Sequence, residues 1–234
     1  MTENELRAKV VREAAGWLGV KEGTVRHRAM VDFYNAITPL PVGYKLKETD
    51  PWCASLVSVV GSAMHLSGII YPECSCPRMV ELYQRAGRWE EADDFVPSAG
   101  DLAFYGWQDS GLGDYQGPPD HVGIVQSVNE GMISVIEGNR NNEVSVRRIP
   151  VNARFIRGFG RPDYAKAAAE LTAERSTSFS DVPAGAWYEQ AVKRVAQAGI
   201  LTGYPDGTFK PSQPLTRAEA AALADRLMAR EDKQ

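Results

Sequence analysis

The 234-residue sequence has few cysteines, few histidines, no basic excess and no long apolar segment. Three cysteines do not make a disulfide-stabilised scaffold. No apolar run approaches the ~20 residues that a transmembrane helix needs, which argues against a membrane span. The net charge of −4 lacks the positive excess of nucleic-acid-binding proteins, so we expect no nucleic-acid partner. The 44% of hydrophobic residues is ordinary for a globular protein, and the length suits two domains.

The cysteines and histidines also lack the spacing of a metal site. Cys74 and Cys76 are separated by one residue, so a bond between them would be strained, and a zinc site would need further ligands. His27, His65 and His121 do not supply that spacing. No acidic loop is dense enough to indicate calcium. We therefore expect no metal or cofactor, and two reduced thiols before a helix that opens at the following proline.

Four polar residues occur in an order that suits acyl-transfer chemistry. Cys53 lies in Pro-Trp-Cys-Ala, His121 in Asp-His-Val-Gly, and Glu137 and Asn139 in Glu-Gly-Asn. Their groups supply a nucleophile, a base, a residue that orients the base and a polar helper. Each residue alone also has an ordinary structural explanation, such as a small core cysteine or an exposed strand end. The four residues would lack a common function only if all of these structural explanations were true at once. Their joint occurrence therefore favours a functional site.

The residues around Cys53 predict an activated thiol. Asp50 followed by Pro51 is a favoured pairing at a helix start, so we expect Asp50 to cap a helix that begins at Pro51. Cys53 then lies in the first turn, where unpaired N–H groups and the helix dipole favour a thiolate.

The histidine and the carboxylate are predicted to lie on one β-hairpin. Residues 121–128 alternate small or polar with apolar side chains, with Gln126 on the apolar face as the exception. Residues 129–131 have turn composition, and residues 132–137 return as a strand. A three-residue loop pairs Val128 with Met132 and therefore His121 with Asn139. Glu137 is then the diagonal neighbour of His121, within side-chain reach.

Five segments together resemble the cysteine, histidine-dependent amidohydrolase/peptidase (CHAP) domains of peptidoglycan hydrolases, including phage endolysins. The resemblance covers about residues 4–162 and rests on segments 16–23, 51–54, 100–104, 121–125 and 136–139. It implies that Cys53 is the nucleophile, His121 the general base, Glu137 the orienting residue and Asn139 the fourth polar member. It also implies an α+β, papain-like (NlpC/P60-type) catalytic domain, with helices first and then an antiparallel sheet. Strands are expected near residues 101–105, 121–128, 132–137, 144–149 and 156–161.

Three aromatic residues are candidates for substrate binding. Trp52 flanks the cysteine, while Trp107 and Tyr115 lie in the Gly/Pro-rich stretch 106–119, which is expected to form a lip over the active site.

Residues 178–229 resemble a single surface-layer homology (SLH) module. The match lies in Ser-Phe-Ser-Asp-Val-Pro, Gly-Tyr-Pro-Asp-Gly-Thr-Phe-Lys-Pro and Leu-Thr-Arg-Ala-Glu. Thr216 and Glu219 predict a capping box, which leaves Arg217 without a local use. The resemblance implies that Asp181, Trp187 and Arg217 bind pyruvylated cell-wall polysaccharide, because a guanidinium matches a carboxylate fork to fork.

The two resemblances give a domain plan: a CHAP-like domain over residues 1–162, a linker over 163–177, and a small all-α SLH module over 178–234. The function expected is peptidoglycan amide hydrolysis at the bacterial cell wall, by an N-acetylmuramoyl-L-alanine amidase or an endopeptidase. An inactive wall-binding protein, a cysteine transferase and a general protease stay open as alternatives. No signal segment precedes the Thr2–Glu5 capping box, so we expect either a removed signal or release through holin pores. Because SLH modules commonly occur in threes, we also expect a homotrimer through the SLH modules.

Overall fold

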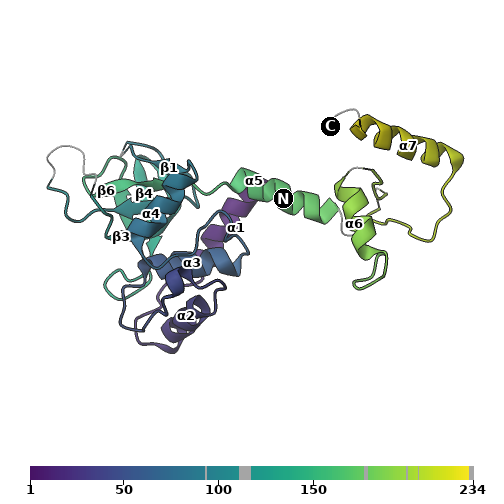
Figure 1. Ribbon diagram of the computed structural model, residues 1–234. Coiled ribbons are helices and arrows are strands. Elements are labelled where there is room, and N and C mark those ends of the chain that lie inside the picture. The colour runs from purple at the N-terminus through teal and green to yellow at the C-terminus, as the bar shows by residue number, and fades with distance from the viewer. Residues whose placement is uncertain (93, 111–116, 177–178, 199, 205, 232–234) are drawn as a thin grey trace. The chain divides into compact units, whose positions relative to one another are not determined.

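A computed structural model describes residues 1–92, 94–110, 117–176, 179–198, 200–204 and 206–231 (Figure 1). Residues Thr2–Ala167 form one compact unit and residues 168–234 form a second. The division between the units falls inside the range 163–177 that was predicted as linker. There the chain is helical, because the Ala- and Glu-rich sequence favours a helix, α5 (Tyr164–Ser176).

The first unit contains four α-helices and a short 3-10 helix among its described residues. They are α1 (Glu3–Ala15), α2 (Val25–Asn35), η1 (Pro41–Gly43), α3 (Cys53–Ala63) and α4 (Cys76–Arg85). Helix α1 begins with the expected capping box of Thr2 and Glu5, and buries Leu6, Val10 and Ala14 on one face. Helix α3 is the central helix, because it packs against α1, α2 and strand β3.

A six-stranded antiparallel sheet follows the helices. Its strands are β1 (Trp89–Glu90), β2 (Leu102–Tyr105), β3 (His121–Asn129), β4 (Met132–Glu137), β5 (Ser145–Pro150) and β6 (Ile156–Gly160), in the spatial order β1-β6-β2-β3-β4-β5. The five predicted strands are confirmed within two residues at each end, and β1 was not predicted. The unit is therefore a mixed fold of helices and antiparallel sheet, as the sequence indicated.

The β3–β4 hairpin has a different turn from the one predicted. Asn129 pairs with Met132, so the loop has two residues, Glu130 and Gly131, both with positive φ. This conformation suits the twist of a tight hairpin. A bulge at Gln126 then shifts the register by one residue, and Gly123 lies opposite Glu137. The predicted loop was wrong, but the bulge restores the predicted register beside the histidine.

The start of α3 also differs from the prediction. The helix begins at Cys53, and its N-cap residue Trp52 makes no side-chain capping bond. Asp50 instead accepts hydrogen bonds from the Lys47 N–H and the Tyr44 hydroxyl, so it closes the preceding turn. Cys53 nevertheless keeps its expected place in the first helical turn.

In the second unit, the described regular elements after α5 are α6 (Glu189–Gln197) and α7 (Arg217–Glu231). The predicted capping box before α7 is confirmed: the Glu219 N–H donates to the Thr216 hydroxyl oxygen, and the Thr216 N–H donates to the Glu219 carboxylate. None of the helices in the described parts of the chain combines the length and apolar character of a membrane span.

Candidate active site

Cys53 is the first residue of α3 and is 5% exposed. The packing of α3 against β3 brings this thiol to the start of the strand that carries His121. Hydrogen bonds with Cys76 and His121, and the backbone N–H of Val122, lower the pKa of Cys53 well below its usual value despite burial. The helix N-terminus favours the same charged form. The structure thus favours the charged thiolate form of this sulfur.

His121 and Glu137 form a buried pair across the hairpin. The His121 Nε2 lies 3.1 Å from the Glu137 Oε2, and the Glu137 side chain is fully enclosed. Burial acts to lower the pKa of His121, but its hydrogen bonds with Cys53 and Glu137 outweigh this and raise the pKa to about 9. Since Nε2 faces Glu137, Nδ1 is the ring nitrogen left for Cys53. The three residues therefore form a thiolate–imidazolium–carboxylate chain.

Arg147 on β5 extends this chain and was missed by the sequence analysis. Its Nε donates to the Glu137 Oε1 at 2.6 Å, and Arg140 Nε lies 4.0 Å from Glu137 Oε2. Burial acts to raise the pKa of Glu137, but the hydrogen bonds from His121 and Arg147 lower it below its usual value. A signal for Arg147 was present in the sequence. Alternation along the expected strand 144–149 allows Arg147 to share a face with Glu137 of the preceding strand, once the two strands are paired.

Two glycines allow Cys53, His121 and Glu137 to come close together. An added Cβ at Gly123 would lie 2.7 Å from the Glu137 Cγ and 2.6 Å from Val135 Cγ1, so only glycine lets Glu137 cross to His121. An added Cβ at Gly138 would lie 3.0 Å from atoms of Trp52 and Leu56, at the start of α3. The motifs His-Val-Gly and Glu-Gly-Asn thus hold the base and the nucleophile close together.

Trp107 provides an aromatic surface beside the histidine. It is 37% exposed and stacks on Tyr105 with a centroid separation of 5.0 Å and an interplanar angle of 7°. Its ring centroid lies 6.1 Å from that of His121, and the Arg147 guanidinium lies 4.8 Å from the Trp107 ring. This position fits the substrate contact that was predicted for Trp107.

The other predicted residues of the site have different outcomes. Trp52 is 1% exposed, and its indole N–H donates to Glu22, so the predicted substrate contact is corrected to a packing role beside Cys53. Asn139 follows β4 with a φ of 55°, and within the described residues its side chain makes no hydrogen bond to His121. Tyr115 lies outside the described residues.

Cys76 is a second residue that the sequence analysis did not place in the site. Its Sγ lies 3.7 Å from the Cys53 Sγ, and it is 6% exposed as the first residue of α4. The proximity of Cys53 and then burial raise the pKa of Cys76 well above its usual value, so it stays a neutral thiol. All three cysteines are free. In the described residues no group of three or more potential ligands is arranged to hold a metal ion.

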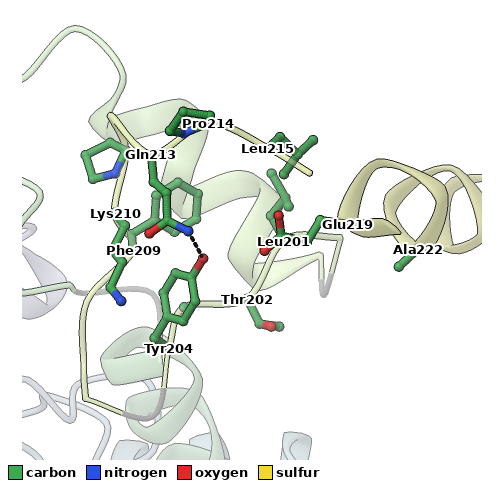
Figure 2. A pocket seen from close by; sticks show the side chains of 12 residues that line it. Leu201, Thr202, Tyr204, Phe209, Lys210, Gln213, Pro214, Leu215, Glu219 and Ala222 are labelled. Atoms are coloured by element: carbon green, nitrogen blue, oxygen red, sulfur yellow. Dashed lines mark hydrogen bonds between the residues drawn. The ribbon is translucent and has the colours of Figure 1, made fainter. Parts of the chain in front are cut away.

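The second unit contains a pocket of about 320 Å³, lined by residues 201–204, 209–211 and 213–215 and by Glu219 and Ala222 of α7 (Figure 2). In it the Gln213 amide donates to the Tyr204 hydroxyl at 3.1 Å, and the Lys210 ammonium lies 4.1 Å from the Tyr204 ring. The pocket was not predicted, and the described residues that line it do not include the three predicted polysaccharide ligands.

Those three residues are placed as follows. Asp181 accepts the backbone N–H groups of Phe209 and Lys210, both at 2.7 Å, so its carboxylate stabilises the fold of the unit. Trp187 is 92% exposed, and Arg217 is exposed at the first position of α7.

Comparison with known families agrees with the two parts of the chain. Residues 45–139 match the CHAP domain, a range that holds Cys53, His121, Glu137 and Asn139. Residues 178–221 match the S-layer homology domain. The chain therefore carries a CHAP domain and an SLH domain, as the two resemblances predicted.

The curated relatives match the SLH part. Outer membrane protein SlpA of Deinococcus radiodurans is 45% identical over 64 residues, which is 27% of this chain and 6% of that protein. Outer membrane protein SlpA of Thermus thermophilus is 54% identical over 50 residues, 21% of this chain and 6% of that protein. S-layer protein EA1 of Bacillus anthracis is 41% identical over 51 residues, which is 22% of this chain and 6% of that protein. The chain thus spans only a small part of the length of these relatives.

Among solved structures, the crystal structure of Ly7917 is similar at a TM-score of 0.39 and 16% identity, covering 70% of this chain and 63% of that chain. A second structure, of Ly7917 with the hydrolyzing product of MDP, has a TM-score of 0.34.

Proposed function

We propose that the protein hydrolyses an amide bond of bacterial peptidoglycan with Cys53 as nucleophile, and that its SLH domain holds it at the cell wall. The observation that carries the proposal is the continuous chain Cys53–His121–Glu137 in a CHAP domain. The lowered pKa of Cys53 and the raised pKa of His121 both favour a thiolate–imidazolium ion pair. Such a pair is the reactive form of a cysteine nucleophile.

The first half of the reaction forms a thioester. The Cys53 thiolate attacks the carbonyl carbon of the amide, and the developing oxyanion meets backbone N–H groups at the start of α3, which lack partners within the helix. Protonated His121 then donates its proton to the leaving amine. Glu137 keeps the imidazolium oriented, and Arg147 keeps Glu137 ionised.

The second half releases the acyl group. Neutral His121 accepts a proton from a water molecule, which attacks the thioester carbonyl. The C–S bond breaks, Cys53 leaves as the thiolate, and the product is a carboxylate. Trp107 is the aromatic surface available to pack on the substrate, because it lies beside His121 and is 37% exposed.

The SLH domain supplies the targeting part of the proposal. Trp187 and Arg217 are exposed and suit contacts with a sugar ring and a ketal carboxylate. Tethering by this domain raises the concentration of wall substrate near Cys53 without new contacts at the active site. Asp181 contributes by fixing the segment at Phe209 and Lys210.

The proposal extends to assembly of the SLH domain as a homotrimer. Several large apolar side chains of the second unit are exposed, and they include Trp187, Leu215, Leu227 and Met228. A small module that leaves such residues in water has a marginal core, which self-association would complete. Closed threefold symmetry is one way for a head-to-tail contact to terminate.

Mass spectrometry of purified peptidoglycan after digestion tests the proposed reaction. New muramic-acid and L-alanine ends identify an amidase, and new peptide termini identify an endopeptidase. Intact peptidoglycan with retained wall binding would instead support an inactive binding protein. Cleavage of unrelated proteins at a similar rate would support a general protease, and transfer of the acyl group to an added amine would support a transferase.

A further inference from the structure

We propose that Cys53 and Cys76 form a redox pair, in which a hydroperoxide oxidises Cys53 and Cys76 captures the product as a reversible disulfide. The two sulfur atoms lie 3.7 Å apart in the interior of the first unit. Each cysteine is the first residue of its helix, Cys53 of α3 and Cys76 of α4, so two helix N-termini converge on one pair of thiols. The mechanism of amide hydrolysis uses only one of them.

The separation of the two thiols suits closure to a disulfide. A disulfide bond is about 2 Å long, so each sulfur needs to move by roughly an ångström. Cys74, although close in sequence, is engaged elsewhere: its thiol lies 3.6 Å from the Glu73 carboxylate and contacts the Tyr34 hydroxyl. The geometry therefore selects Cys76 rather than Cys74 as the partner.

The charge distribution sets the order of events. Cys53 carries the thiolate and reacts first, whereas the proximity of that thiolate raises the pKa of Cys76 and keeps it protonated. Oxidation of Cys53 to a sulfenic acid removes its negative charge. The largest cause of the raised pKa of Cys76 then disappears, and its place at a helix N-terminus favours ionisation. Cys76 thus becomes a nucleophile only after its partner has been oxidised.

The chemistry balances as a two-electron oxidation. The Cys53 thiolate attacks one oxygen of the hydroperoxide, the O–O bond breaks, and the other oxygen leaves as water or an alcohol after protonation by His121. The Cys76 thiol then loses a proton and attacks the Cys53 sulfur. The S–O bond breaks and water leaves, so one peroxide is reduced while two thiols become a disulfide. A dithiol reductant restores both thiols by exchange.

Burial restricts the oxidants that reach the pair. With exposures of 5% for Cys53 and 6% for Cys76, a small peroxide has access, whereas a bulky disulfide such as oxidised glutathione is hindered. Disulfide formation removes the thiolate that the proposed hydrolysis needs, and it protects Cys53 from irreversible oxidation. This consequence for hydrolysis rests on the proposed function, but the formation of the bond does not.

The test uses the full chain, hydrogen peroxide and two matched variants, Cys76→Ser and Cys74→Ser. Intact mass and peptide maps under non-reducing conditions are recorded before and after peroxide, and again after dithiothreitol. We expect the unchanged chain and Cys74→Ser to lose two hydrogen atoms, to give a linked peptide containing Cys53 and Cys76, and to recover with dithiothreitol. In Cys76→Ser, Cys53 gains two oxygen atoms and does not recover.

Three outcomes overturn the proposal. They are oxygen adducts at Cys53 in the unchanged chain without a linked peptide, a linked peptide that contains Cys74, and equal recovery of Cys76→Ser. The map of the unchanged chain decides the question even if a variant misfolds. A linked Cys53–Cys76 peptide in a protein that never cleaves peptidoglycan supports the redox pair and rejects the proposed function, so the two failures are distinguishable.

Discussion

Arg147 donates a hydrogen bond to Glu137 at 2.6 Å, on the carboxylate oxygen that does not face His121. The interaction joins β5 to β4 and places a permanent positive charge beside a fully enclosed carboxylate. A charge-assisted bond in such surroundings is stronger than a neutral one. Arg147 therefore acts on the active site through Glu137, as a positioning residue.

Replacing Arg147 by Gln should slow peptidoglycan hydrolysis about tenfold, which corresponds to about 1.4 kcal/mol of barrier. Without the guanidinium, Glu137 loses a partner and holds the imidazolium less firmly. The measurement is the initial rate of product release from purified peptidoglycan. The matched control is Arg148→Gln on the neighbouring exposed position, for which we expect the parent rate. Equal rates for the two variants would show that Arg147 does not contribute to hydrolysis.

Replacing Gly123 by Ala should reduce both activity and stability. The new methyl group would lie 2.7 Å from Glu137 Cγ and 2.8 Å from the Ile136 carbonyl oxygen, so Glu137 or the hairpin must shift. Overpacking of this kind lowers the free energy of unfolding by about 1–3 kcal/mol. The control is Gly68→Ala, where an added Cβ meets nothing within 4 Å. Denaturant unfolding and hydrolysis rates are measured for both variants. A Gly123→Ala variant with the stability and rate of the parent would contradict the close approach of Gly123 to Glu137.

The rate of hydrolysis should fall as the pH rises through about 9. The leaving amine needs protonated His121, and the pKa of this residue is raised from 6.5 to about 9, so the required proton is present below that value and lost above it. On the acidic side the lowered pKa of Cys53 extends the range of pH in which the thiolate is present. In Glu137→Gln the carboxylate that raises the pKa of His121 is gone, so the alkaline limit should move to lower pH. A profile that already declines near 6.5 in the parent would contradict the ion pair.

Light scattering tests the proposed trimer at micromolar concentration. We expect a mass about three times that of the 25.7 kDa chain. Replacing Leu227 and Met228 by Glu should give the monomer, because these exposed apolar side chains are candidates for the contact. A truncated chain that ends at residue 176 should also be monomeric. Truncation at this point retains Tyr164, which the first unit needs because its side chain is buried there and its hydroxyl donates to the Gly100 carbonyl. A monomeric full chain would reject the trimer.

The sequence predicted the parts of the site that depend on local pattern. The alternation after His121 located β3, and the register beside Glu137 was correct because two departures offset each other: a shorter turn at Glu130 and Gly131, and a bulge at Gln126. The alternation breaks at Gln126, where the bulge lies, but that break was not interpreted as a bulge, and the turn type left no mark in the alternation.

The parts that could not be predicted come from distant segments. Cys76 reaches the site from α4, and its position depends on how this helix packs against α3. Alternation along the expected strand 144–149 gave the face of Arg147, but not the pairing of that strand with β4 that brings Arg147 to Glu137. Trp52 was expected to face substrate because it flanks Cys53. Instead Trp52 is buried, and its indole N–H donates to the Glu22 carboxylate. Sequence neighbourhood alone does not show which side of a helix start faces solvent.

The central claim is that Cys53 performs the hydrolysis, and the most direct test compares the parent with Cys53→Ala on purified peptidoglycan. Mass spectrometry follows new ends, while circular dichroism and wall binding confirm that the variant is folded and targeted. The account predicts a loss of roughly a thousandfold or more for Cys53→Ala, and a similar loss for His121→Ala, because members of such a unit act together. Product release by folded Cys53→Ala within a few-fold of the parent would contradict it.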